Sequence, residues 1–106
     1  MVKELPVEEL KAMLDRGETP LILDVRERWE YDLVHLPQAT LIPMNTIPRR
    51  MDELDKQAKI VVYCHHGARS WNVAAYLLQN GFSSVQNLTG GIDAWARRVD
   101  RMMRTY

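Results

Sequence analysis

The residues with the clearest chemical potential stand in one short run: a cysteine followed by two histidines, a glycine, an alanine, an arginine and a serine. A free cysteine is only about 3% thiolate at pH 7, and the thiolate is the nucleophile. A nearby guanidinium and inward-pointing backbone N–H groups both favour the charged form. We therefore predict that Cys64 is a nucleophile. The residues predicted to form its substrate-binding loop are His65, His66, Gly67, Ala68, Arg69 and Ser70.

The same run allows two less specific interpretations. A cysteine at the end of an apolar strand is commonly a small buried hydrophobic residue, and paired histidines can bind a metal ion. Three adjacent residues rarely close on one ion, and only His35 remains as a further nitrogen donor. Gly67 and Arg69 favour the nucleophile, and we expect neither a metal nor a cofactor. The two histidines are interpreted as walls of the loop.

Two elements must position this loop. Before it, residues 59–63 are apolar and rich in β-branched side chains, which predicts a central strand. After it, Ser70 precedes a predicted helix that ends at Gly81. The apolar face of this helix consists of Val73, Ala74, Leu77 and Leu78. Since ligands of open α/β sheets bind at the carboxyl ends of the strands, the loop lies where a binding site is expected.

The rest of the chain alternates in the same way. Helices are predicted from Pro6 to Gly17, at 28–33, at 47–54 and from Ile92 to Met103, and strands at 21–25, 40–42 and 83–88. Buried strands that alternate with amphipathic helices predict an α/β domain with a mainly parallel sheet. Because the 106 residues contain no repeat or linker, we expect one domain over residues 1–106.

The composition excludes several classes of protein. With 14 basic and 14 acidic side chains the formal net charge is zero, so no overall field gathers nucleic acid or an anionic membrane. A single cysteine excludes an internal disulfide. The first ten residues lack the apolar core of a signal peptide, and no run approaches the ~18 apolar residues of a membrane span. We expect a cytoplasmic protein with neither nucleic acid nor a membrane as its partner.

Four sets of residues occur in a distinctive order along the chain. They are Leu23–Glu27 with Trp29–Tyr31, His35–Pro37, Val61–Cys64 with Gly67, Arg69 and Ser70, and Gly90–Ile92 with Ala94 and Trp95. Together they resemble the signatures of a single-domain rhodanese, a member of the rhodanese-like sulfurtransferase family, over roughly residues 5–96. The chain departs from this pattern at Gln38-Ala39, where the family commonly has a glycine after the proline.

The resemblance implies a rhodanese-like three-layer fold, with a mainly parallel central sheet flanked by helices. It also implies that Cys64 takes a sulfane sulfur from thiosulfate or a related donor and passes it, as a persulfide, to cyanide or a thiol acceptor. One alternative is a persulfide carrier or regulatory module that serves a protein partner. A more distant one is a cysteine-dependent phosphatase or arsenate reductase. Four residues separate Cys64 from Arg69, one fewer than in the phosphatase loop, so the ring is expected to fit sulfur better than a phosphoryl group.

Residues outside the loop receive structural interpretations. Asp24 and Arg26 are expected to form an ion pair that supports the fold, and His35 to bond the backbone of its own turn. Gly90 and Gly91 permit close packing or unusual dihedrals. The three tryptophans, Trp29, Trp71 and Trp95, suit the core or a pocket wall.

Four arginines make the last helix basic: Arg97, Arg98, Arg101 and Arg104. Favourable charge near a helix C-terminus accounts for them on a solvated face. The alternative interpretation is a surface for an acidic protein partner that donates or accepts sulfur.

Overall fold

Five parallel strands form the centre of the computed structural model, which describes residues 1–106. They are β1 (Lys3–Leu5), β2 (Leu21–Asp24), β3 (Thr40–Leu41), β4 (Lys59–Tyr63) and β5 (Ser84–Leu88), arranged in the order β1-β5-β4-β2-β3. The apolar strand β4 is central, because Val62 pairs with Leu23 on one side and with Asn87 on the other. The prediction of a mainly parallel sheet is confirmed, and every pairing in the sheet is parallel.

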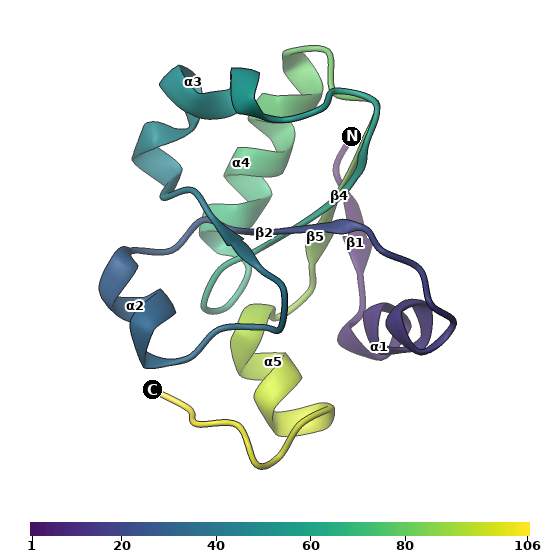
Figure 1. Ribbon diagram of the computed structural model, residues 1–106, viewed down its shortest axis with the longest axis vertical. Helices are drawn as coiled ribbons and strands as arrows, with labels where there is room; N and C mark the ends of the chain where they lie inside the picture. The colour runs from purple at the N-terminus through teal and green to yellow at the C-terminus, as the bar shows by residue number, and fades with distance from the viewer.

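Helices cover both faces of this sheet (Figure 1). They are α1 (Val7–Asp15), α2 (Arg28–Leu33), α3 (Ile47–Arg50), α4 (Ala68–Gln79) and α5 (Gly91–Arg98), with 3-10 turns at Met44–Thr46 and Met51–Glu53. One buried cluster joins α3 and α4 to the sheet and includes Ile47, Leu77 and Val62. The other joins α1 and α5 to the opposite face and includes Leu10 and Trp95. The predicted three-layer arrangement is therefore confirmed.

Several element boundaries differ from the prediction. Strand β1 was not predicted at all, and α4 begins at Ala68 rather than after Ser70, which places Arg69 and Ser70 in its first turn. The last helix ends at Arg98 rather than at Met103, since the N–H groups of Val99 and Asp100 both bond the carbonyl of Trp95 and close the helix.

The three tryptophans have different environments. Trp95 is buried between α5 and the sheet, as expected, whereas Trp71 is half-exposed beside a hollow that Val2, Ala75 and Leu78 also line. The expectation of core or pocket-wall packing is wrong for Trp29, which is 63% exposed. Its ring forms a T-shaped pair with Tyr106, at 5.9 Å between centroids. No helix combines the length and apolar character needed to cross a membrane.

The turn after His35–Pro37 closes without the glycine that the resemblance described above led us to expect there. Gln38 adopts a left-handed conformation with φ of 62°, the only residue other than glycine with a positive φ. Side chains with a Cβ are strained in this region. Gln38→Gly is therefore expected to raise the free energy of unfolding by about 0.5–1 kcal/mol, because relief of strain exceeds the added entropy of the unfolded chain.

Urea denaturation measures this change. Gln57→Gly is the matched control, since Gln57 is also exposed in a turn but has no positive φ. The control variant is expected to lose stability. A Gln38→Gly protein that unfolds at lower urea than the wild type contradicts the prediction.

Candidate active site

The thiol of Cys64 lies at the carboxyl end of β4, enclosed by the loop that follows it. Its side chain is 1% exposed. The sulfur accepts hydrogen bonds from the backbone N–H of Gly67 at 3.1 Å and of Ser70 at 3.4 Å, and the Ser70 hydroxyl lies 3.3 Å away. Two N–H groups directed at one sulfur, at the start of α4, form an anion-stabilising nest. The loop therefore has the geometry that stabilises a sulfur anion.

A chain of polar side chains anchors the loop to the sheet. The Ser70 hydroxyl has three acceptors within reach, Cys64 Sγ, the Gly67 carbonyl and Asn87 Oδ1, and the contact with Asn87 is the shortest. The Asn87 amide nitrogen donates to the Gly67 carbonyl and to the carboxylate of Glu4 on β1. The neighbouring strands β5 and β1 thus fix the position of the loop against the thiol.

Two glycines allow the close packing that the loop requires. Gly67 has φ of 116°, a conformation that favours glycine, and its N–H donates to the sulfur. Gly91 lies against the loop, where a Cβ would be 2.5 Å from the carbonyl oxygens of both Cys64 and His65. Those carbonyls accept hydrogen bonds from the first turn of α5, from the N–H groups of Ile92 and Asp93. The expectation of close packing at Gly91 is confirmed.

Arg69 does not present a free positive charge to the loop. Its guanidinium forms two hydrogen bonds, of 2.8 and 3.0 Å, with the carboxylate of Glu30 on α2. Glu30 is nearly buried, and its oxygens also accept the backbone N–H of Glu27 and the hydroxyl of Tyr106. The sequence-based expectation treated Arg69 as an uncompensated cation, whereas the structure pairs it with a buried acid.

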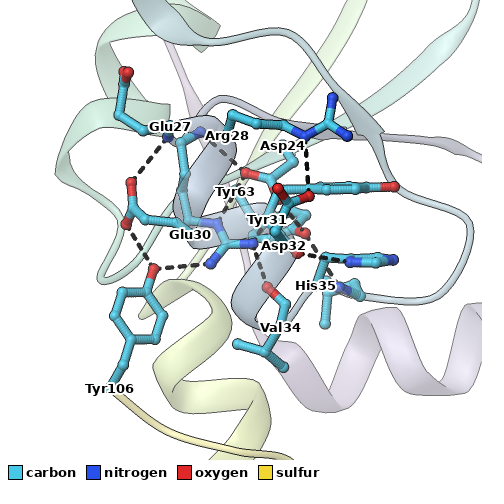
Figure 2. Close-up of polar contacts among 12 residues, drawn as sticks. Asp24, Glu27, Arg28, Glu30, Tyr31, Asp32, Val34, His35, Tyr63 and Tyr106 are labelled. Carbon is cyan, nitrogen blue, oxygen red and sulfur yellow. Dashed lines mark hydrogen bonds and ion pairs between the residues drawn. The ribbon is translucent and has the colours of Figure 1, made fainter.

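Tyr106 joins the C-terminal segment to both this pair and the loop. Its hydroxyl donates to Glu30 at 2.6 Å, as Figure 2 shows, and accepts from Arg26 at 2.8 Å. Its ring stacks on His65 with 3.8 Å between centroids, and His65 in turn packs against His66. The segment after α5 therefore crosses toward α2 (Figure 1) and covers one wall of the loop.

These contacts shift the pKa values of Glu30 and His65. Burial raises the pKa of Glu30, but hydrogen bonds from Arg69, Tyr106 and the Glu27 N–H outweigh it and lower this pKa from 4.5 to about 2. Burial and the neighbouring His66 lower the pKa of His65 below its ordinary 6.5, so His65 is neutral near pH 7. The permanent charges beside the thiol are thus a compensated pair.

The lowered pKa of Glu30 predicts a dependence of stability on acid. The ionised carboxylate contributes fully above pH 4.5, the ordinary pKa, and its contribution is lost as pH falls toward 2. The temperature of thermal unfolding is therefore expected to fall more steeply with pH through this window in the wild type than in Glu30→Gln, because glutamine has no charge to lose. Parallel declines of the two proteins contradict the prediction.

A second ion pair lies under the site, wholly buried. Arg26 donates to both carboxylate oxygens of Asp24 at 2.9 and 2.7 Å, and the Tyr63 hydroxyl donates to Asp24 at 2.7 Å. Arg26 also donates to the carbonyl of Val34. The prediction of a structural Asp24–Arg26 pair is confirmed. His35 Nδ1 lies 2.9 Å from the carbonyl of Tyr31, so its bond to the backbone is confirmed, although this carbonyl belongs to α2 rather than to the turn itself.

Only one cluster of side chains has the composition of a metal site. His65, His66 and Asp93 each offer a ligand atom, and these atoms lie within 4.8 Å of one another. Asp93 already accepts a hydrogen bond from Arg97 at 3.0 Å, however, and lies 3.9 Å from the His66 ring. The arginine compensates the one carboxylate, which makes the cluster a weak competitor for cations.

The sequence correctly brings Cys64 to Ser70 together around the thiol, although Ala68, Arg69 and Ser70 belong to the first turn of α4 rather than to a loop. It assigns no role to three residues that contact this segment. Glu30 was noted only within a family signature, although the spacing of Glu27 and Glu30 is that of the capping box that begins α2. Asn87 was counted only as part of a strand. Tyr106 carried no local signal, because it follows the last helix in an irregular segment.

The protein is thus an α/β domain with a parallel sheet, in which backbone N–H groups at the end of the central strand are directed at a cysteine sulfur. Residues 6–98 match the model of the rhodanese-like domain, and the chain belongs to this family. It is 44% identical over 97 residues to a sulfurtransferase of Allochromatium vinosum, covering 92% of this chain and 91% of the relative. A putative sulfur carrier protein of Bacillus subtilis, YrkF, is 33% identical, over 93% of this chain and 54% of the relative.

The solved structures agree with this assignment. A rhodanese-like domain protein from Staphylococcus aureus superimposes with a TM-score of 0.86 at 33% identity, covering 99% of both chains. The rhodanese-like fold expected from the sequence is thus confirmed. The named relatives support a role in sulfur transfer, with sulfur donors and acceptors as partners in general terms.

Proposed function

We propose that the protein is a sulfurtransferase that carries sulfane sulfur as a persulfide on Cys64. The thiolate attacks the outer sulfur of thiosulfate or a related donor, the donor's S–S bond breaks, and the leaving group departs with the electron pair, as sulfite in the case of thiosulfate. Cyanide or a thiol then attacks the outer sulfur of the persulfide and restores the thiolate. This divides one transfer into two displacements.

The observation that carries the proposal is the pair of N–H groups, from Gly67 and Ser70, directed at Cys64 Sγ. They stabilise negative charge on sulfur both before attack and after the persulfide forms. The leaving groups are stable anions, so the reaction needs no acid, metal or cofactor. The remaining residues of the loop, His65, His66, Ala68 and Arg69, enclose the transferred sulfur in this proposal.

Intact-mass spectrometry tests the first half of the reaction. Incubation with a donor is expected to add the mass of one sulfur atom, and cyanide is expected to remove it with formation of thiocyanate. A protein that gains no sulfur from any donor contradicts the proposal. Treatment of the loaded protein with a reducing agent is the control for oxidation, because it removes persulfide sulfur but not the two oxygens of a sulfinic acid, which have nearly the same mass.

A carrier or regulatory role is the second candidate, favoured by the similarity to the putative sulfur carrier protein. It uses the same persulfide but delivers the sulfur to a protein partner. A carrier is expected to load as readily as an enzyme and yet to turn over negligibly with cyanide or small thiols. The ratio of the loading rate to the turnover rate therefore distinguishes the two.

A further inference from the structure

The loop contains a single permanent cation, and a buried acid neutralises it. Among residues 64–70 only Arg69 is an arginine or lysine, and both of its terminal nitrogens bond Glu30. Four hydrogen bonds hold the Glu30 carboxylate in place, two from Arg69, one from the Glu27 N–H and one from Tyr106. To pair with Arg69, an incoming anion would have to displace the Glu30 carboxylate, which all four hydrogen bonds hold in place.

The other charged groups near the loop are also compensated. Arg26 is buried and donates hydrogen bonds to both carboxylate oxygens of Asp24, which neutralises its charge. His65 is neutral near pH 7 because burial and His66 lower its pKa. The groups that bond the sulfur itself are the backbone N–H groups of Gly67 and Ser70, which are dipoles and carry no full positive charge.

Sulfur donors differ in the charge they bring to this environment. Thiosulfate is a dianion, so its reaction with a thiolate gathers three negative charges in one transition state. The protonated hydropersulfide R–S–SH brings none, and its transition state carries only the charge of the thiolate. Repulsion between like charges is strong away from bulk water, and it is relieved only by fixed donors or cations. The compensated loop therefore discriminates between the two donors.

We infer that the sulfur donor is a hydropersulfide, and that Glu30 acts through Arg69 as the residue that disfavours thiosulfate. This rests on the proposed function of Cys64. The Cys64 thiolate attacks the outer sulfur of R–S–SH, the S–S bond breaks, and R–S⁻ leaves with the bonding pair. The outer sulfur keeps its proton, so that Cys64 becomes a hydropersulfide and no oxidant or reductant is consumed.

The test compares kcat/KM for cysteine hydropersulfide and thiosulfate in the wild type and in Glu30→Gln. The wild type is expected to prefer the hydropersulfide by about tenfold or more. Glutamine keeps an acceptor for the Glu27 N–H but frees the charge of Arg69. The variant is therefore expected to raise kcat/KM for thiosulfate about tenfold, with little change for the hydropersulfide. This gain is expected to shrink as salt is added.

Glu53→Gln is the matched control, because Glu53 forms an equivalent two-bond pair with Arg50 on the exposed surface. It alters net charge by the same amount and is expected to keep the wild-type ratio. Should Glu30→Gln not fold, Tyr106→Phe removes one donor from Glu30 and is expected to shift the ratio in the same direction. Measurement of kcat/KM for persulfidated serum albumin, in parallel with cysteine hydropersulfide, shows whether a protein or a small molecule is the better sulfur donor.

Distinct results overturn the inference and the proposed function. A wild type that uses thiosulfate as well as either hydropersulfide overturns the inference, as does a ratio that is unchanged in Glu30→Gln or shifted equally in Glu53→Gln. In all of these cases Cys64 still gains sulfur by intact mass. If no donor loads Cys64, the proposed function itself fails.

Discussion

Replacement of Cys64 by serine is expected to reduce sulfur transfer by ~10⁴-fold or more. A serine hydroxyl is almost wholly protonated at neutral pH, and its oxygen forms no persulfide. The exchange is nearly isosteric, and the N–H groups of Gly67 and Ser70 that bond the sulfur remain available to the oxygen. The measurements are the rate of thiocyanate formation and the mass gained on incubation with donor.

The interpretation depends on an intact fold, so the thermal unfolding of Cys64→Ser is compared with that of the wild type. Since Cys64 is the only cysteine, no other thiol of the chain can substitute for it. Ser70→Ala serves as a second comparison, because it removes the hydroxyl beside the sulfur but leaves the thiol. Cys64→Ser that keeps a tenth of the wild-type rate would contradict the assignment of Cys64 as the nucleophile.

Patterns of neighbouring residues predicted the helices and strands whose formation depends on their own sequence. Strand β4 and helix α2 have the bounds that their apolar and charged residues indicated. Strand β1 was missed because its three residues show no periodicity, and it exists only through its pairing with Gln86–Leu88 of β5. A short edge strand of this kind is determined by its partner rather than by its own sequence.

In the candidate site, too, features set by neighbouring residues were predictable and contacts between distant residues were not. The connection between β4 and α4 at Cys64 was predictable because a strand, a glycine and a helix start occur in succession, although the helix begins earlier than expected, at Ala68. The partner of Arg69 was not, since Glu30 lies 39 positions away along the chain, and Tyr106 lies 76 positions from Glu30. Residue types in the loop therefore indicated a cation, and only the fold shows that this cation is neutralised.

Arg26→Met is expected to lower the free energy of unfolding by about 3–5 kcal/mol. The side chains of Arg26 and Asp24 are both fully buried, so loss of the guanidinium leaves a carboxylate without its counter-charge in the interior. Methionine fills much of the space of the arginine stem, which makes the lost charge the main change. Guanidinium chloride denaturation measures the difference.

The matched control is Arg28→Met, because Arg28 pairs with Asp32 at the surface, where the side chains are 76% and 58% exposed. It is expected to cost less than about 1 kcal/mol. If both variants lose the same free energy of unfolding, burial of the Asp24–Arg26 pair is not the cause of the loss in Arg26→Met.

The double variant Asp24→Asn with Arg26→Met separates charge from packing. Asparagine keeps an oxygen that accepts the Tyr63 hydroxyl, as Asp24 does, but it has no charge to leave unpaired. The double variant is therefore expected to be more stable than Arg26→Met alone, since an uncompensated charge costs more than an unfilled hydrogen bond. A double variant less stable than Arg26→Met would show instead that the remaining carboxylate still supports the fold through Tyr63 and the Arg26 backbone N–H, which Asp24 also accepts.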